Sequence, residues 1–172
     1  LMVSETDRLT RLINGVLDFA RMEKGERKYE KTKLDIARLT ERLVESERLR
    51  LEQGGFSVGF RNELGEAVIE ADGEALEQAL LNLLSNAEKY SREAKRIEVE
   101  IAGAPGAVLI RVLDRGIGVP AREAKRIFQE FYRVDDSPTA RVTGSGLGLP
   151  IALRIVRDHG GELWFESQEG AF

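Results

Sequence analysis

Cysteine is absent from this sequence of 172 residues, and histidine occurs only once. The absence of cysteine excludes disulfides and thiolate metal sites, although it does not fix the cellular compartment. No apolar run approaches the roughly 20 residues that a membrane-spanning helix needs, and no signal peptide is evident. The sequence is therefore not that of a disulfide-stapled domain, a zinc–thiolate domain or a membrane span.

The composition is that of an ordinary globular protein. Hydrophobic residues make up 42% and charged residues 33%, and 26 Lys and Arg against 30 Asp and Glu give a formal net charge of −4. This balance gives no electrostatic reason to expect nucleic acid or an anionic membrane as a partner. The length suffices for one well-cored domain with a small appendage. Because the sequence begins inside a helical pattern and stops where a strand starts, we expect a piece of a larger protein.

An amphipathic helix is predicted near the N-terminus, over residues 5–23. Apolar residues recur there at intervals of three and four, with charges on the opposite face. The sequence "EKGERKYEKTK" (23–33) then breaks the pattern with Gly25 and a dense run of charges, which is typical of an interdomain linker. The helix either packs on the domain that follows or pairs with a second helix and a partner subunit. We favour pairing, because a lone amphipathic helix before a linker has little else to bury against.

Helices and strands are mixed along the remaining chain. Asp35 and Asp72 are suited to cap two helices, and Gly54-Gly55 ends the first of them. The predicted elements are helices over 35–53, from 72 onward, over 120–131 and 149–158, and strands over 56–60, 67–71, 96–102, 107–114 and 162–167. This mixture predicts an α/β fold, in which one mixed, mostly antiparallel sheet is covered by helices on one face to form a two-layer sandwich, preceded by one N-terminal helix.

The helix after Asp72 carries an unexpected polar segment, "NLLSNAEKYS" (82–91), at its end. At about 100° per residue, Asn82, Asn86 and Lys89 fall on one stripe beside the apolar face. Amide oxygens and an ammonium group on a helix edge suit a hydrated Mg²⁺ ion and the phosphates that it bridges. Taken alone, the stripe is better described by two solvent-facing asparagines and an ordinary surface lysine.

Two glycine-containing segments lie further along the chain. In "DRGIGVP" (114–120), Asp114 can accept a hydrogen bond from an exocyclic amine, and Gly116 and Gly118 let the backbone approach a flat ligand. "TGSGLGLPIA" (143–152) precedes a helix and offers backbone N–H groups to phosphate. It matches neither a P-loop nor a Rossmann fingerprint. For the first segment, an ordinary turn with Asp and Gly at a strand end is the simpler alternative. For the second, the alternative is a flexible turn, against which the alternation of Gly and Leu argues.

In this order, with "RIFQEFYRV" (126–134) between the two glycine segments, the motifs resemble those of the catalytic and ATP-binding domain of sensor histidine kinases. "NLLSNAEKYS" resembles the N box, "DRGIGVP" the first glycine box, "FQEFYRV" the F box and "TGSGLGLPIA" the second glycine box. The resemblance covers residues 34–172, and "FARMEKGERKYEKTKLD" resembles the end of the second dimerisation helix and its connector. It implies a Bergerat-type fold, with part of the dimerisation domain at 1–24, a linker at 25–34 and the catalytic and ATP-binding domain at 35–172, cut at its last strand.

The resemblance also implies roles for individual residues. Asn86 would ligate Mg²⁺ with Asn82 beside it, and Lys89 would meet phosphate oxygens. Arg133 would lie near the γ-phosphate, where charge develops in phosphoryl transfer. The catalytic residues implied are Asn82, Lys89 and Arg133, and the further ATP-binding residues are Tyr90, Asp114, Gly116, Gly118, Gly144, Ser145, Gly146, Leu147 and Gly148.

The loop over 132–146 would be the ATP lid, anchored by Phe128 and Phe131. Two departures from the family pattern are mild. Ser145 stands where Thr is usual, and Pro150 stands where a small residue is more common. Neither departure removes a side chain that the mechanism needs.

The single histidine, His159 in "VRDHGG", lies at the end of the last predicted helix and is interpreted as structural. The family's phosphoacceptor is expected within a His-Glu pair on a first dimerisation helix, which this sequence does not contain. The chain should therefore bind ATP and Mg²⁺ without phosphorylating itself on histidine.

The partners implied are ATP, a second copy of the full-length protein through the dimerisation domain, and the receiver domain of a response regulator, with no nucleic acid. The implied location is cytoplasmic, as part of a membrane-anchored sensor. Two alternatives stay open. Related ATPases carry a Glu one helical turn before the metal-binding Asn, where this sequence has Asn82. A kinase-like domain could also bind nucleotide and dock partners without transferring phosphate.

Overall fold

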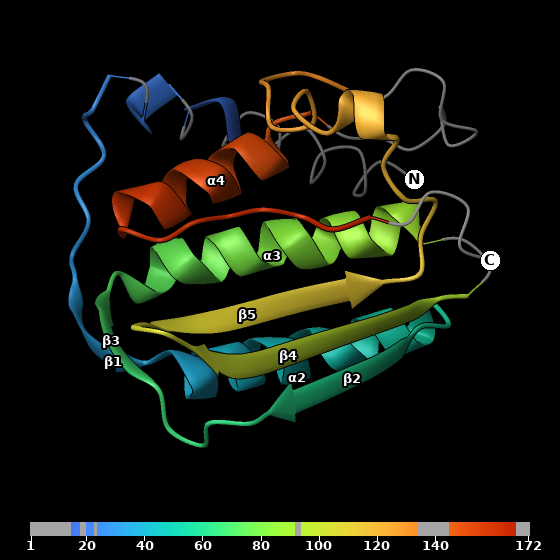
Figure 1. Ribbon diagram of the computed structural model, residues 1–172, viewed down its shortest axis with the longest axis horizontal. Coiled ribbons are helices and arrows are strands. Elements are labelled where there is room, and N and C mark those ends of the chain that lie inside the picture. The colour runs from blue at the N-terminus through green and yellow to red at the C-terminus, as the bar shows by residue number, and fades with distance from the viewer. Residues whose placement is uncertain (1–14, 18–19, 23, 92–93, 134–144, 168–172) are drawn as a thin grey trace, which may run out of the picture.

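The computed structural model of the protein describes residues 15–17, 20–22, 24–91, 94–133 and 145–167 (Figure 1). Its elements follow in the order β1 (Thr32–Asp35), α2 (Ile36–Gln53), β2 (Ser57–Asn62), β3 (Val68–Ala71), α3 (Gly73–Tyr90), β4 (Arg96–Ala104), β5 (Ala107–Asp114), the 3₁₀ helix η1 (Ala121–Glu123) and α4 (Gly148–Asp158). The predicted helix over 5–23 lies mostly outside the described residues, although 15–17 and 20–22 are helical.

The central sheet has three strands in the order β2-β4-β5. β2 runs parallel to β4, with Ser57 opposite Arg96, and β5 runs antiparallel to β4, with Asp114 opposite Ile97. Strands β1 and β3 form a separate antiparallel pair. In Figure 1, α2 passes behind the three strands, and α3 runs alongside the sheet, next to β5. The predicted mixed sheet covered by helices is confirmed.

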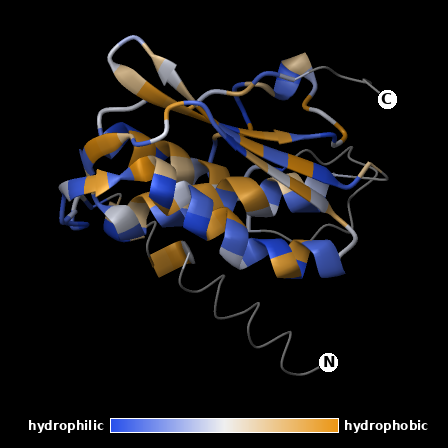
Figure 2. Ribbon diagram, turned by 90° about the horizontal axis from the view of Figure 1, so that it is seen from below, coloured by the Kyte–Doolittle hydropathy of each residue, from blue (hydrophilic) through white to orange (hydrophobic). Residues whose placement is uncertain are grey.

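Alternating side chains on β4 explain why the sheet is covered on one face. Ile97, Val99 and Ile101 are 0–1% exposed and join the core formed with α2 and α3. Burial of each such side chain contributes about 1.5–3 kcal/mol. The intervening Glu100 pairs with Arg61 of β2 at 2.5 Å on the other, polar side. Figure 2 shows hydrophobic and hydrophilic residues alternating along the strands in this way.

Two aspartates begin the long helices, as predicted. Asp35 caps α2, because its Oδ1 accepts hydrogen bonds from the N–H of Ala37 at 3.0 Å and from the N–H of Ala67, ahead of β3, at 3.1 Å. Asp72 caps α3 through the N–H of Ala75 at 3.0 Å. These caps satisfy N–H groups that a helix cannot pair internally, and they also fix where each helix meets the strands before it.

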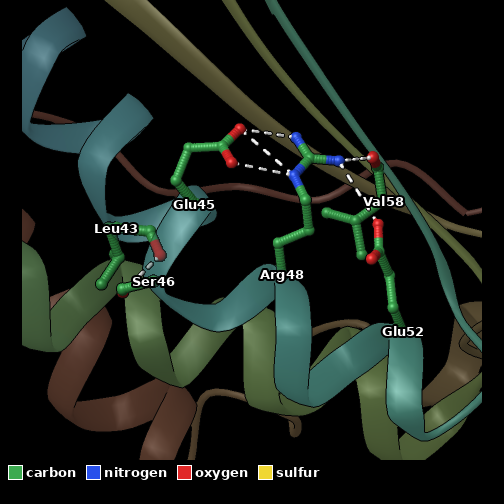
Figure 3. A network of polar contacts seen from close by, with 6 residues as sticks. All are labelled: Leu43, Glu45, Ser46, Arg48, Glu52 and Val58. Carbon is green, nitrogen blue, oxygen red and sulfur yellow. Dashed lines mark hydrogen bonds and ion pairs between the residues drawn. The ribbon is translucent and has the colours of Figure 1, made fainter.

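A polar network holds α2 against β2 (Figure 3). The guanidinium of Arg48 pairs with Glu45 at 2.8 Å and with Glu52 at 3.8 Å, both on the same helix. It also donates a hydrogen bond to the backbone oxygen of Val58 in β2. Ion pairs this exposed contribute little by themselves. The bond to Val58 is the part of the network that joins helix to strand.

A second core lies between α3 and α4. Ala75 and Ala79 of α3 are 0% and 3% exposed, and these small side chains let α4 approach closely. Met22, from the helical turn at 20–22, is 2% exposed and packs into the same cluster. Helix α3 is therefore buried on two sides, by the sheet core and by α4.

Three predictions of local structure need correction. Residues 32–35, largely within the predicted linker at 25–34, form β1 instead, because they pair with β3. The predicted helix over 120–131 is a 3₁₀ turn followed by further turns, since most of its N–H groups reach back three residues and not four, as in Glu123 to Pro120 and Gln129 to Arg126, both at 2.8 Å.

The predicted strand over 162–167 is not a strand in the structure, although the residues are described. Its contacts run through side chains: Ser167 Oγ accepts a hydrogen bond from the N–H of Val119 at 2.7 Å, and the Phe165 ring lies 6.1 Å from that of Phe128. Among the described residues, no helix is long and apolar enough to cross a membrane.

Candidate nucleotide-binding site

The polar end of α3 lies against the start of α4. The Oδ1 atom of Asn82 is 3.4 Å from the position that a Cβ would take on Gly148, the first residue of α4. The Nδ2 atom of Asn82 is buried, and nothing among the described residues accepts its hydrogen bond. A buried amide without a partner costs free energy unless a ligand or water completes it. Asn82 is therefore a candidate to bind a ligand or a water molecule through its Nδ2 group.

The first glycine box docks on the C-terminal end of α3. Gly116 forms an isolated bridge with Ser91, and the N–H of Ile117 donates to the backbone oxygen of Tyr90 at 3.2 Å. A Cβ on Gly116 would lie only 2.6 Å from that Tyr90 oxygen, so no other residue fits without a shift of the backbone. This close approach explains the glycine that the sequence pattern singled out.

Asp114 is oriented by the same loop. Its Oδ1 accepts a hydrogen bond from the N–H of Gly116 at 2.7 Å. Burial of the carboxyl group raises the pKa of Asp114, and the hydrogen bond from Gly116 acts against that rise. Asp114 is nevertheless exposed to solvent, so its carboxylate is an accessible acceptor at the end of β5, held by its own turn.

The second glycine box packs against the F box. Gly146 has a φ of +71°, and a Cβ there would lie 2.7 Å from the carbonyl carbon of Phe131 and 3.0 Å from the oxygen of Tyr132. Ser145 Oγ accepts a hydrogen bond from the N–H of Leu147 at 3.3 Å, and Leu147 is buried in front of α4. Phe131 itself has a left-handed φ of +57°. The turn before α4 and the end of the F box therefore fit together as one unit.

Five of the predicted site residues take part in three close contacts: Asn82 with Gly148, Tyr90 with Gly116, and Gly146 with the backbone at 131–132. Asn86 and Lys89 lie about one and two turns beyond Asn82 on α3. Gly118 has a φ of +69°, which the turn requires. Gly144 and the lid residues 134–144 lie outside the described residues. Arg133 directly follows Tyr132, at the edge of that segment.

These residues fit a magnesium-bound nucleotide. Leu147, the N-cap residue of α4, makes no side-chain cap, so the first N–H groups of the helix suit phosphate. No group of three or more Asp, Glu or His side chains that could hold a metal occurs in the described part. A magnesium ion here would therefore take an amide oxygen together with phosphate oxygens and water, which is a coordination that Mg²⁺ accepts. The buried Nδ2 of Asn82 adds an unused donor at the same place.

His159 is structural, as predicted. Its Nδ1–H donates to the backbone oxygen of Ile155 at 2.7 Å, and its Nε2 accepts from the N–H of Asp72 at 3.1 Å. The ring also makes an edge contact with Tyr29, with 4.8 Å between the ring centroids. Both ring nitrogens are thus used to join the end of α4 to the start of α3.

One polar residue that the sequence analysis missed is Glu123, which is buried and accepts a hydrogen bond from the hydroxyl of Tyr132. The signal was present but weak: a single acidic residue at the centre of the basic segment "AREAKR". Nothing in the spacing shows that this glutamate turns inward to meet the F box.

The comparisons with known proteins identify the family of this chain. A family profile described as "Histidine kinase-, DNA gyrase B-, and HSP90-like ATPase" matches residues 71–172. Sensor histidine kinase WalK of Bacillus subtilis (strain 168) is 33% identical over 176 residues, which cover 99% of this chain and 28% of that protein. The structure of full-length ShkA in complex with AMPPNP aligns with a TM-score of 0.79 at 29% identity, over 95% of this chain and 35% of that one.

The structure of histidine kinase ThkA in complex with the response regulator protein TrrA has a TM-score of 0.75 at 21% identity, over 97% of this chain and 46% of that one, which shows the shared fold. The fold and its converging motifs define an ATP-binding domain of the kind shared by gyrase, chaperones and kinases. The chain belongs to the histidine kinase-, DNA gyrase B- and HSP90-like ATPase family, in its sensor histidine kinase branch. It spans less than a third of the length of the Bacillus relative, namely 28%.

Proposed function

We propose that this chain is the catalytic and ATP-binding domain of a sensor histidine kinase, and that it presents ATP for transfer of the γ-phosphate to a histidine on a dimerisation helix. The observation that carries the proposal is that both glycine boxes contact α3 and that the second one also contacts the F box. Gly116 rests on the end of α3, Gly146 on the F box, and Gly148 beside Asn82. Only glycine permits the first two approaches, which supports a backbone shaped around a ligand.

Each part of the site has a role in this proposal. The carboxylate of Asp114 accepts a hydrogen bond from the adenine amino group, which favours ATP over GTP. The N-terminus of α4 and the second glycine box bind the triphosphate. Asn86 would hold the magnesium ion, which would supply positive charge that lowers the repulsion between the phosphates and the acceptor. Lys89 and Arg133 neutralise charge as the phosphoryl group leaves the bridging oxygen of ADP for a ring nitrogen of the acceptor histidine.

Transfer is favoured over hydrolysis by the chemistry of Asn82. An amide cannot take a proton from water, so this position offers no general base where related ATPases carry a glutamate. The site would hold ATP until a histidine arrives. Steady-state hydrolysis by the isolated chain should therefore be slow.

The decisive experiment mixes this chain with a dimerisation domain of the WalK type and γ-labelled ATP. We expect acid-labile phosphate on the dimerisation domain and none on this chain. A dimerisation domain whose acceptor histidine is replaced by glutamine is the control. Rapid hydrolysis without acceptor would identify an ATPase instead, and ATP binding without transfer would identify a docking module.

The remaining parts of the proposal concern the longer protein. We infer that it dimerises through the region at 1–24, that it passes phosphate to the receiver domain of a response regulator, and that this domain is cytoplasmic in a membrane-anchored sensor. The ThkA–TrrA complex supports the second point through a shared fold. A longer protein that is monomeric by light scattering would contradict the first.

A further inference from the structure

A buried acidic side chain lies beneath the F box, outside the contacts described above for the nucleotide. Glu123, at the end of η1, is 8% exposed, and it is the one charged residue in the buried set of the described residues. Its carboxylate accepts a hydrogen bond from the hydroxyl of Tyr132, and the guanidinium groups of Arg122 and Arg126 each approach it to 3.4 Å. A buried carboxylate is retained at a cost unless its partners compensate it. The residues that bind the Glu123 carboxylate therefore indicate the role of this buried charge.

The side chain of Tyr132 is held both at its hydroxyl group and over the face of its ring. Its hydroxyl is bound by Glu123, and the guanidinium of Arg126 lies over its face, 4.2 Å from the ring centroid. A hydrogen bond to a charged acceptor is stronger than one between neutral groups. The Tyr132 side chain is thus fixed by two interactions that both originate in the segment 123–126.

The backbone that carries this ring supports the second glycine box. A Cβ on Gly146 would lie 2.7 Å from the carbonyl carbon of Phe131, 2.8 Å from its Cα and 3.0 Å from the oxygen of Tyr132. Phe131 adopts a left-handed φ of +57°, which is unfavourable for an aromatic residue and persists only where the surroundings impose it. The anchored Tyr132 ring is the neighbouring element that can impose it.

We propose that Glu123 is a positioning residue of the phosphate end of the site. Through Tyr132 it fixes the backbone at 131–132, which sets the turn at Gly146 before α4 and the direction in which Arg133 leaves the F box. This inference rests on the proposed function, because it assigns the purpose of the Glu123–Tyr132 pair to the handling of ATP. Glu123 itself does not touch the nucleotide.

The charge state of the pair agrees with this role. The hydrogen bond from Tyr132, followed by the nearby arginines, holds the pKa of Glu123 below its usual range despite desolvation. Glu123 is therefore ionised at neutral pH, and its carboxylate forms a charge-assisted hydrogen bond with the hydroxyl of Tyr132 at that pH.

The test uses Glu123→Gln and Tyr132→Phe, singly and together, with Glu130→Gln as the matched control. Glu130 is an exposed glutamate of the same segment. Both changes at the pair keep the size of the side chain, and Tyr132→Phe also keeps the ring that Arg126 contacts. We measure ATP affinity by calorimetry, transfer in the presence of a WalK-type dimerisation domain, and the amide resonances of Gly146 and Leu147 by NMR.

Each single change should lower the rate of transfer at saturating ATP by about tenfold, as expected for loss of a charged hydrogen bond. The double variant should be no slower than the worse single variant, because the charged hydrogen bond that Tyr132→Phe removes is already lost in Glu123→Gln. The amide resonances of Gly146 and Leu147 should shift in these variants and not in Glu130→Gln. A role in folding alone would lower the urea midpoint and leave the resonances and the rate of the folded protein unchanged.

The inference would be overturned if wild-type protein bound ATP and transferred phosphate while Glu123→Gln and Tyr132→Phe matched it in rate and spectrum. It would also be overturned by losses that simply multiply in the double variant. Failure of the proposed function has a different signature, since the wild-type protein would then bind no ATP or transfer no phosphate in the first measurement.

Discussion

Replacing Gly146 with alanine separates the conformational requirement for glycine from the spatial one. The structure provides a matched control, because Gly106 in the β4–β5 hairpin has the same φ of +71° and nothing within 4 Å of its Cβ position. Alanine at a left-handed position costs about 1–2 kcal/mol, and this cost applies to both glycines. Only Gly146→Ala also forces a methyl group to within 2.7 Å of Phe131. Such overpacking adds about 1–3 kcal/mol.

Gly106→Ala should therefore lose about 1–2 kcal/mol of unfolding free energy, and Gly146→Ala about 2–5 kcal/mol. Urea unfolding followed by circular dichroism measures both values. ATP affinity, measured by calorimetry, should be unchanged in Gly106→Ala. It should fall roughly fivefold or more in Gly146→Ala, because the strain is relieved by moving the turn away from the F box.

Equal losses of stability in the two variants would refute this reasoning, since they would show that the contact with Phe131 carries no energy. Wild-type ATP affinity in a folded Gly146→Ala protein would refute the second step. It would mean that the turn can move without consequence for the nucleotide.

Three further predictions concern pH and packing. Burial, followed by the hydrogen bond from its hydroxyl to Asp158, raises the pKa of Tyr29 to about 12. The neutral phenol thus stabilises the fold below its unfolded pKa of about 10, and this stabilisation is lost as pH rises toward about 12. Tyr29→Phe should therefore remove a tyrosine ionisation step near pH 12 from an alkaline absorbance titration. Leu84→Ala, at a position 3% exposed in the sheet core, should cost about 2–5 kcal/mol in urea, whereas Leu81→Ala, 38% exposed on the same helix, should cost less than about 0.5 kcal/mol. Hydrogen bonds, led by that from the N–H of Ala67, lower the pKa of Asp35. The ionised carboxylate therefore stabilises the fold above its unfolded pKa, and this stabilisation is lost as pH falls through the folded pKa. Asp35→Asn should flatten the acid side of a profile of unfolding free energy against pH, and an unchanged profile would contradict the capping role of Asp35.

Much of the fold is predictable from local signals that act over a few residues. Asp35 and Asp72 begin their helices because a short acidic side chain can accept the first free N–H groups, and no distant contact is needed for that. The hairpin at 103–106 is likewise set by its own Pro-Gly turn. β1 is different: "TKLD" has no strand-like alternation, and only pairing with β3, more than thirty residues away, makes it a strand.

The candidate site divides in the same way. The glycines at 116 and 146 are visible in the sequence, but the reasons for them lie in the backbone of Tyr90 and Phe131, which the chain brings near only after folding. Glu123 could not be identified because its partner, Tyr132, is joined to it through a series of turns that the sequence pattern suggested to be a helix. The roles of Asn86, Lys89 and Arg133 stay predictions, since they depend on a nucleotide and on the lid.

Helix α4 is engaged at both of its ends. At its C-terminus, the hydroxyl of Tyr29 donates to Asp158 at 3.0 Å, and Lys31 donates to the Asp158 backbone oxygen at 2.7 Å. Its other end begins at the turn beside Asn82. Eleven residues make a rod about 16 Å long. A displacement of the chain at 29–31 would therefore be transmitted along α4 to its N-terminus, where the groups assigned to phosphate lie.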